Sequence, residues 1–296
     1  LQQDGEVGYC EWQGMEVIKI LQGNCLEVLK DLPGQSVNTC ITSPPYWGLR
    51  DYGQDNQLGL EKTPEEFVEN LVKVFKEVKR VLRDDGTVWL NLGDSFSKEK
   101  QLHGIPWRVA FALQSDGWYL RQDIIWHKPA PMPESVTDRC TKAHEYIFLL
   151  SKNKKYYFDN ESIKEDAVGN DPGNKSPHKH KGQPFSETKK NMDKISAVSK
   201  RNKRSVWTVP TKPFKGAHFA TFPPDLIKPC VLAGCPEGGA VLDPFGGAGT
   251  TGLVAEQNNR DSILIELNPE YAQIARDRLY NDAPLFVDVE SEVWKS

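Results

Sequence analysis

The chain has 296 residues, of which 38% are hydrophobic and 26% charged, a composition typical of a soluble globular protein. Its length is enough for one large domain with a full core, or for one domain with an insertion. No apolar run approaches the ~18 residues that a membrane-spanning helix requires, and residues 1–14 lack the basic and apolar regions of a secretory signal. The sequence therefore argues against a membrane protein or a secreted one.

The six cysteines are scattered and include no Cys-x-x-Cys pair. We expect reduced, partly buried thiols, as in a cytoplasmic protein, and neither a disulfide framework nor a zinc site. His178 and His180 are two residues apart, but no cysteine or acidic cluster accompanies them. The sequence thus predicts no metal site.

The formal net charge of −4 alone argues against a nucleic-acid partner, but the charge is unevenly distributed. Residues 169–204 contain ten Lys or Arg and three Asp or Glu, a local net charge of +7, which leaves −11 on the remainder. A basic segment on an acidic body is typical of contact with phosphates. Because this segment has few apolar residues, a solvated, flexible loop is the other interpretation.

Apolar periodicity and turn signals predict alternating strands and helices along the chain. We expect strands at 17–21, 37–41, 87–92, 119–126, 145–150, 155–158, 240–243 and 262–267. We expect helices at 25–32, 63–82, 105–113, 224–232, 250–256 and 269–280. In the longest helix, Thr63 is the expected N-cap, Pro64 the first helical residue and Glu66 the partner in a capping box. The alternation indicates an α/β fold, a doubly wound and mostly parallel sheet with helices on both faces.

Residues 42–47, Thr-Ser-Pro-Pro-Tyr-Trp, form the most informative stretch and follow the predicted strand 37–41. Neither proline has a backbone N–H to donate, and each favours an extended conformation of the residue before it. A stiff turn is therefore expected at the strand end. It presents the Ser43 hydroxyl, freed carbonyl groups and the rings of Tyr46 and Trp47. Such groups can hold a flat ring that carries an amine.

Residues 241–251 indicate a strand, a glycine-rich turn and the start of a helix. The three glycines allow a sharp bend and the close approach of a ligand. Asp243 ends the strand, where it can pair with a cationic amine. The turn lacks the lysine of a P-loop, which favours a nucleotide-like ligand without a triphosphate. A tight turn that only packs helix on strand is the alternative.

Glu266 ends the next predicted strand, 20 residues after Gly246. In dinucleotide-binding folds, an acidic residue at about this spacing accepts hydrogen bonds from ribose hydroxyls. The spacing therefore implies a ribose, whereas the glycine turn does not imply a pyrophosphate. A carboxylate that is merely solvated at the strand end is the other interpretation of Glu266.

The two stretches 42–46 and 243–251 together resemble the catalytic motif and the cofactor loop of DNA amino-methyltransferases that use S-adenosylmethionine. Their order resembles the permuted beta class, which places its target-recognition region between them. In this family the first motif residue is Asp or Asn when the target is usually adenine, and Ser when it is usually cytosine N4. Ser43 therefore implies a cytosine-N4 enzyme with a fold of the class I methyltransferase type.

The resemblance implies a set of site residues. For catalysis these are Ser43, Pro44, Pro45 and Tyr46. For the cofactor, and its product S-adenosylhomocysteine, they are Asn24, Thr42, Thr221, Phe222, Asp243, Pro244, Phe245, Gly246, Gly247, Gly249, Thr250, Thr251 and Glu266. For DNA they are Trp47, Lys128, Arg139, His144, Lys200, Arg201, Lys203 and Arg204. Asn24 departs from the family, which often has Asp at this position.

The implied reaction is direct attack by the cytosine amine on the sulfonium methyl group, without a covalent enzyme intermediate. We expect Ser43 Oγ and the Pro44 carbonyl to accept hydrogen bonds from the amine, so that positioning is the main catalytic effect. The base must leave the helix first, and Tyr46 is expected to stack on it, supported by Trp47. A core aromatic behind the turn is the alternative role for Tyr46.

The expected organisation is a catalytic part at 15–160, a basic target-recognition insertion at 161–205 and a cofactor-binding part at 206–282. DNA is the expected partner. A cognate restriction nuclease, and the choice between a monomer and a homodimer, stay open. The alternatives to cytosine-N4 transfer are an adenine-N6 enzyme, an RNA methyltransferase and an inactive nucleic-acid-binding relative.

Overall fold

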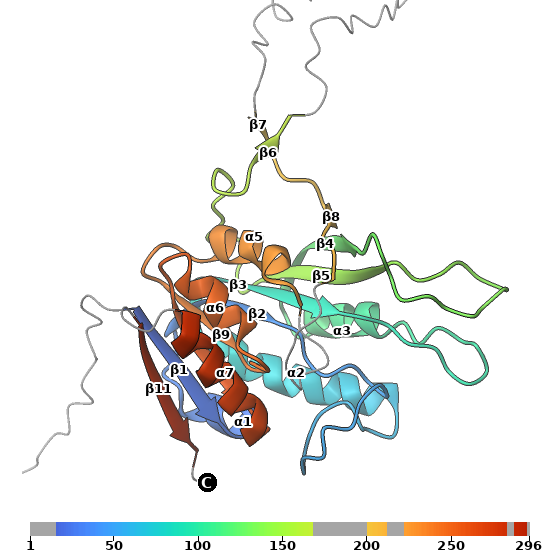
Figure 1. Ribbon diagram of the computed structural model, residues 1–296, viewed down its shortest axis with the longest axis horizontal. Helices are drawn as coiled ribbons and strands as arrows, with labels where there is room; N and C mark the ends of the chain where they lie inside the picture. Colours follow the sequence, from blue (N-terminus) through green and yellow to red (C-terminus); the bar gives the residue numbers. More distant parts are fainter. Residues whose placement is uncertain (1–15, 168–199, 212–221, 283–286, 295–296) are drawn as a thin grey trace, which may run out of the picture.

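A nine-stranded sheet organises the protein. The computed structural model describes residues 16–167, 200–211, 222–282 and 287–294, and the sheet order is β11-β1-β10-β9-β2-β3-β5-β4-β8 (Figure 1). The strands are β1 (Glu16–Gln22), β2 (Val37–Thr42), β3 (Leu82–Leu92), β4 (Tyr119–His127), β5 (His144–Ser151), β8 (Val206–Thr208), β9 (Ala240–Asp243), β10 (Asp261–Glu266) and β11 (Val287–Val293). β5 runs antiparallel to β3 and β4, and the other pairings are parallel.

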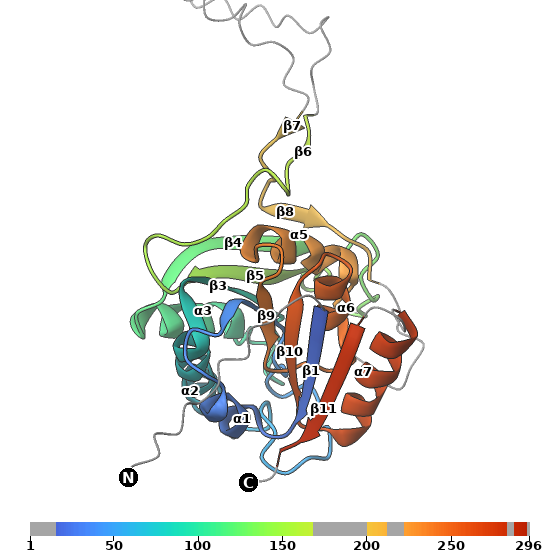
Figure 2. The ribbon, with the colours of Figure 1, turned by 90° about the vertical axis from the view of Figure 1, so that its left-hand side faces the viewer.

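Helices cover both faces of this sheet (Figure 2). One face carries α1 (Cys25–Asp31), α2 (Pro64–Val81) and α3 (Ile105–Ser115), whose apolar residues share one buried cluster with the strands. The other carries α5 (Pro224–Gly234), α6 (Thr250–Glu256) and α7 (Pro269–Asp282), which pack over two further buried clusters. The predicted doubly wound, mostly parallel α/β fold is confirmed.

The longest helix, α2, begins as its sequence predicts. Thr63 is the N-cap, with its hydroxyl accepting a hydrogen bond from Glu66 N at 3.2 Å, and Pro64 is the first helical residue. The Glu66 carboxylate accepts instead from Lys62 N at 3.1 Å, one residue before the position that a capping box requires. The helix buries a stripe of apolar residues against β3 and α3, which comprises Phe67, Leu71, Val74, Phe75, Val78 and Val81.

The strand order reverses direction between β9 and β2. From β9 the chain continues through α6 to β10 on one side, whereas from β2 it continues through α2 to β3 on the other. Thr39 and Cys40 pair with Val241 and Leu242, so the two strands end at the same edge of the sheet. Ligands of open α/β sheets bind in the crevice at such a switch point.

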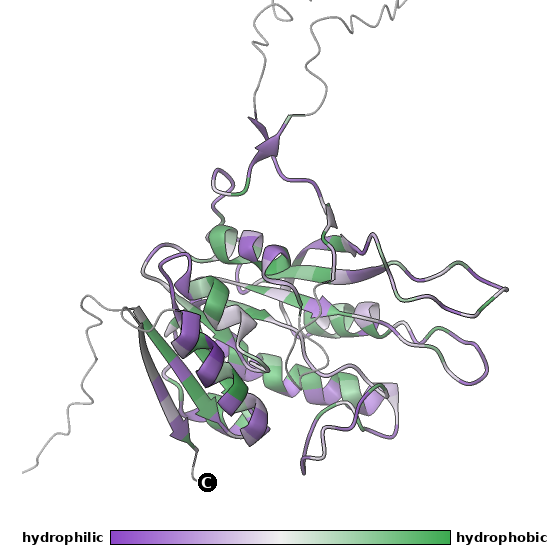
Figure 3. Cartoon of the chain, viewed as in Figure 1, coloured by the Kyte–Doolittle hydropathy of each residue, from purple (hydrophilic) through white to green (hydrophobic). Residues whose placement is uncertain are grey.

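A small two-stranded sheet stands away from the main one. β6 (Glu165–Asp166) and β7 (Lys200–Arg201) pair antiparallel, and Arg201 Nε lies 2.9 Å from Glu165 Oε1. Figure 3 shows this pair as hydrophilic, in contrast to the apolar strands of the main sheet. The predicted insertion, residues 161–205, therefore contains paired strands near both of its described ends. Residues 168–199 of the predicted insertion lie outside the described residues.

Three features differ from the predicted elements. Residues 155–158 form no strand, because Tyr157 N and Asp159 N donate instead to single carbonyls of Asp85 and Ala233. β3 begins at Leu82, directly after α2, rather than at residue 87. β8 and β11 were not predicted, since three residues of β8 are too few for a pattern and β11 follows the last predicted helix. In the described parts of the chain, no helix has both the length and the hydropathy to cross a membrane.

Candidate active site

The candidate site lies at the carboxyl ends of β2 and β9, where the two singled-out stretches meet. Thr42, the last residue of β2, donates a hydrogen bond of 2.6 Å from its hydroxyl to Asp243 Oδ1 at the end of β9. Both side chains are buried, with 0% and 2% of their surface exposed. The turn at residues 42–47 and the glycine-rich turn are therefore joined directly.

Both carboxylate oxygens of Asp243 accept hydrogen bonds from other residues of the protein. Oδ1 also accepts from Phe245 N at 3.1 Å, and Oδ2 accepts from the Thr251 hydroxyl at 2.6 Å. Burial raises the pKa of Asp243 to about 6, although these hydrogen bonds oppose the rise. Asp243 thus fixes the glycine-rich turn onto β2. Its pairing with a ligand amine stays a prediction.

The glycine-rich turn needs glycine at a specific position. Gly249 has a left-handed φ of 73° and precedes α6 as its N-cap. A Cβ there would lie 3.1 Å from the Cβ of Ala275 in α7, so a side chain would be both strained and crowded. Gly247, with a φ of 51°, turns its N–H toward Glu266.

Glu266 closes the far side of this turn. Its Oε2 accepts from Gly247 N and its Oε1 from Asn268 N, each at 2.8 Å. Burial raises the pKa of Glu266, and the two backbone hydrogen bonds oppose that rise. Each oxygen has a further lone pair, so the carboxylate can accept from ligand hydroxyls while it holds the turn.

A cavity of about 840 Å³ extends from the glycine-rich turn to the end of β2. Most of the predicted site residues line it, namely Asn24, Ser43, Pro44, Pro45, Tyr46, Lys128, His144, Phe222, Asp243, Pro244, Phe245, Gly246, Gly247, Thr250 and Glu266. Asn24 also caps α1, since its Oδ1 accepts from Leu26 N at 2.9 Å. Thr42 and Thr251 do not line the cavity, but the hydroxyl of each donates a hydrogen bond to Asp243. The volume suits a nucleoside-sized ligand together with a second flat ring.

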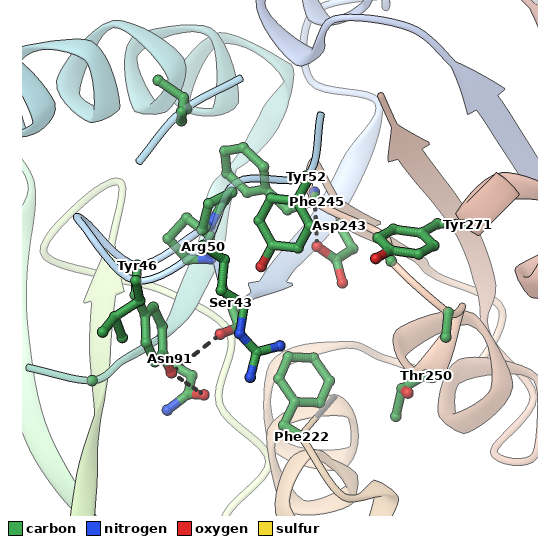
Figure 4. Close-up of a pocket in the computed structure, with 18 of the residues that line it drawn as sticks. Ser43, Tyr46, Arg50, Tyr52, Asn91, Phe222, Asp243, Phe245, Thr250 and Tyr271 are labelled. Carbon is green, nitrogen blue, oxygen red and sulfur yellow. Dashed lines mark hydrogen bonds between the residues drawn. The ribbon is translucent and has the colours of Figure 1, made fainter. Parts of the chain in front are cut away.

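Tyr52, Tyr271 and Arg50 are among the cavity residues that were not predicted from the sequence. Tyr52, in the loop after β2, meets Tyr271 of α7 edge to face, with 6.1 Å between ring centroids. Figure 4 shows Arg50 reaching into the same cavity between Ser43 and Phe222. The loop thus closes over the cavity opposite the glycine-rich turn. Tyr271 gave no signal, because a single tyrosine inside a helix is most often a packing residue.

A hydrogen-bonded cluster surrounds Tyr46 behind Ser43. The Tyr46 hydroxyl lies 2.7 Å from Glu145 Oε2, 3.2 Å from Asn91 Oδ1 and 3.4 Å from Ser43 Oγ. The ring packs on Gly93, where an added Cβ would lie 2.6 Å from Tyr46 Cε2. Burial, and then the Glu145 charge, raise the pKa of Tyr46. Tyr46 therefore lines the cavity with a fixed ring.

The predicted DNA-contacting residues divide into two groups. Lys128 and His144 line the cavity. The Lys128 ammonium is paired with Glu145 Oε1, and burial together with the nearby Lys142 ammonium lowers the pKa of His144. Lys142, which the sequence analysis did not single out, reaches the Asp94 carbonyl at 2.9 Å and so joins two loops at the mouth of the cavity.

The other predicted DNA-contacting residues lie away from the cavity lining. Trp47 donates to the Glu61 carbonyl at 2.9 Å, and Arg139 pairs with Glu134 at 2.6 Å. The remaining ones lie at or beyond β7 and comprise Lys200, Arg201, Lys203 and Arg204. Thr221 lies outside the described residues. In the described part of the chain, no group of three or more His, Cys, Asp or Glu side chains is placed to hold a metal ion.

Sequence comparisons place the chain among DNA-modifying enzymes. A family model for DNA methylases, named N6_N4_Mtase, matches residues 37–277. The Type II methyltransferase M.Cfr9I of Citrobacter freundii is 46% identical, over 89% of this chain and 88% of its own. M.SmaI of Serratia marcescens, also a Type II methyltransferase, is 45% identical over 91% and 93%.

Solved structures of similar fold agree with this placement. TTHA0409 of Thermus thermophilus, described as a DNA modification methylase and solved with S-adenosyl-L-methionine, has a TM-score of 0.63 at 25% identity over 92% of this chain and 99% of its own. The PvuII DNA methyltransferase, cytosine-N4-specific, has a TM-score of 0.66 at 20% identity over 95% and 99%, which is a likeness of fold. The switch-point cavity, the family match and the similarity to Type II enzymes lead to one conclusion: the chain belongs to the DNA methylase family.

Proposed function

We propose that this protein is a site-specific DNA methyltransferase that transfers a methyl group from S-adenosylmethionine to the N4 atom of a flipped-out cytosine. One observation carries the proposal. Ser43 and Glu266 line the same cavity, so an amine-positioning turn and a ribose-type acceptor face a common space.

The residues of the cavity fit S-adenosylmethionine. Glu266 offers carboxylate oxygens to ribose hydroxyls beside the glycine-rich turn, and the rings of Phe222, Phe245 and Tyr52 provide apolar walls for a purine. Asn24, at the start of α1, offers an amide to the same space. When bound, this cofactor supplies an electrophilic methyl group on a sulfonium, and the protein supplies orientation.

The choice of cytosine rests on Ser43. The Ser43 hydroxyl and the Pro44 carbonyl can each accept one hydrogen of an exocyclic amine. These two hydrogen bonds hold the nitrogen with its lone pair directed at the methyl group. In the family that the chain resembles, Ser at this position accompanies cytosine and Asp or Asn accompanies adenine. The fixed ring of Tyr46 can stack on the base once it has left the helix.

DNA is the proposed substrate because of the positive charge around the site. Lys128 and Lys142 lie at the cavity, and the basic residues near β7 project from the body of the protein. The relatives that match over most of the chain are Type II methyltransferases, which supports action at a specific site and a cognate restriction nuclease as partner. Such an enzyme acts in the cytoplasm, where the DNA is.

Mass spectrometry of nucleosides tests the proposal. DNA and RNA from cells that express the protein are digested separately and compared with DNA and RNA from cells that express the Asp243→Asn variant. We expect N4-methylcytosine only with the active protein. N6-methyladenine without N4-methylcytosine would replace cytosine by adenine as the target, and methylated nucleosides confined to RNA would overturn the DNA assignment.

A further inference from the structure

We propose that Glu145 is a positioning residue, which sets the direction of a hydrogen-bond chain so that Ser43 Oγ faces the substrate amine as an acceptor. The inference rests on the proposed function, because it requires an amine beside Ser43. It assigns a role to a cluster of side chains that the reaction scheme above leaves unexplained.

Glu145 lies at the centre of this cluster. It is in β5, with 15% of its side chain exposed, and it lines the cavity. Its Oε1 accepts from the Lys128 ammonium, and its Oε2 lies 2.7 Å from the Tyr46 hydroxyl and 3.3 Å from Asn91 Nδ2. The paired ammonium offsets the cost of keeping a carboxylate in a partly buried place. Both oxygens of Glu145 therefore act as acceptors.

Asn91 has its amide orientation fixed by two neighbours. Its Nδ2 donates to Glu145 Oε2 and, at 3.1 Å, to the carbonyl of Tyr146. Its Oδ1 is consequently turned toward the Tyr46 hydroxyl, at 3.2 Å. A flipped amide would bring Oδ1 against two acceptors, the Tyr146 carbonyl and the Glu145 carboxylate, and would turn Nδ2 toward the Tyr46 hydroxyl.

Tyr46 thus faces two acceptors with a single proton. Its hydroxyl must donate to Glu145 or Asn91, and its oxygen can then only accept from the third neighbour, Ser43 Oγ at 3.4 Å. The raised pKa of Tyr46 keeps that proton in place. Figure 4 shows Ser43, Tyr46 and Asn91 in this connected arrangement.

The direction of the chain decides what Ser43 can do. A serine hydroxyl has one proton and two lone pairs, and it can rotate to serve as donor or acceptor. When its proton is directed at Tyr46, its lone pairs remain to accept a proton of the substrate amine, whose own lone pair faces the methyl group. Glu145 therefore acts on the amine through Tyr46 and Ser43, without touching it.

A double-mutant cycle on Glu145→Gln and Tyr46→Phe tests this. Gln keeps the shape of Glu145 but can donate to Tyr46, and Phe keeps the ring of Tyr46 but removes the hydroxyl. In the protein that retains Tyr46, Glu145→Gln should lower kcat about 10-fold, which is the effect of one hydrogen bond. The Kd for the cofactor should not change. In the Tyr46→Phe background it should lower kcat less than 2-fold.

The outcomes separate this inference from the proposed function. If Glu145→Gln lowers kcat equally in both backgrounds, or weakens cofactor binding as much as it lowers kcat, Glu145 is merely structural and the inference fails. If wild-type protein transfers no methyl group to DNA, the proposed function itself fails.

Discussion

The hydroxyl of Thr42 donates a 2.6 Å hydrogen bond to the carboxylate of Asp243, although 201 residues separate the two positions in the chain. Each of the two residues begins one of the turns that form the cavity. A shift of one turn therefore moves the other, and in the proposed reaction the distance between amine and methyl donor depends on this contact. Geometric errors of about 1 Å can reduce turnover by roughly 10²-fold.

Thr42→Val should therefore weaken both stability and turnover. Valine has the shape of threonine but leaves Asp243 Oδ1 without its hydroxyl donor in a buried place. We expect the free energy of unfolding to fall by about 1–3 kcal/mol, as measured by urea denaturation. Thr137→Val, in an exposed loop, is the control and should change it by less than about 0.5 kcal/mol. Equal stabilities of the two variants would contradict a structural role for the contact.

The raised pKa of Asp243 predicts a pH-dependent contribution to stability. Its ordinary pKa is 3.8 and burial raises it to about 6, so the folded state binds the proton more tightly than the unfolded state. The stability from the neutral carboxyl is fully present below pH 3.8 and is lost as the pH rises through about 6. We subtract the free energy of unfolding of Asp243→Asn from that of the wild type. This difference should fall by up to roughly 3 kcal/mol as the pH rises across this window. A constant difference would show that Asp243 does not titrate there.

Ser43→Ala should remove most of the turnover and leave cofactor binding intact. We expect kcat to fall by roughly 10²-fold, because the amine loses an acceptor that orients it. Filter-binding of methylated DNA gives kcat, and isothermal titration gives the cofactor Kd. Ser36→Ala is the matched control, since that hydroxyl donates only to the Pro33 carbonyl before β2. Unchanged turnover in Ser43→Ala would remove Ser43 from the mechanism.

Gly93→Ala should displace the ring of Tyr46. The new methyl group would lie 2.6 Å from Tyr46 Cε2, closer than carbon atoms can approach. Overpacking of this kind costs about 1–3 kcal/mol, and we expect turnover to fall with the displaced ring. Gly34→Ala is the control, because its nearest neighbour atom would lie at 3.6 Å. Thermal unfolding and methylation rates of both variants provide the comparison.

Neutralising Lys200, Arg201, Lys203 and Arg204 should weaken DNA binding and flatten its dependence on salt. Each phosphate contact that is lost reduces the slope of log K against log salt by about 0.9. The same number of charges removed elsewhere, at Lys30, Lys73, Lys76 and Arg83, is the control for net charge. If both quadruple variants have the same slope, the basic segment is a solvated face and makes no contact with DNA.

The order of most elements and the position of the candidate site could be predicted from the sequence. The stretches 42–47 and 243–251 are rich in prolines and glycines, respectively. The backbone conformations of these residues are restricted or permitted locally, so the turns can be recognised from the sequence alone. Glu266 was predictable by its spacing. These three features sufficed to place the cavity at the ends of β2, β9 and β10.

The tertiary partners of these residues were not readable. Asp243 has the position of a ligand-binding residue, but the hydroxyls that engage it come from residues 42 and 251, and only the folded sheet brings these together. Lys128 similarly has the character of a phosphate contact, whereas in the structure its ammonium is paired with Glu145. Hydrogen bonds and ion pairs between polar residues far apart in the sequence leave no periodic or local pattern. They therefore cannot be predicted from the sequence alone.

The sheet order also constrains how the chain acquires its shape during synthesis. Among the described strands of this sheet, β1 comes first in the chain, whereas both of its neighbours, β10 and β11, come last. β2 similarly keeps one unpaired edge until β9 follows about 200 residues later. Parallel pairings at such sequence separation form slowly and leave strand edges exposed meanwhile. A nascent chain of this protein thus lacks the candidate site, and exposes strand edges that favour aggregation, until β9 and β10 have been synthesised.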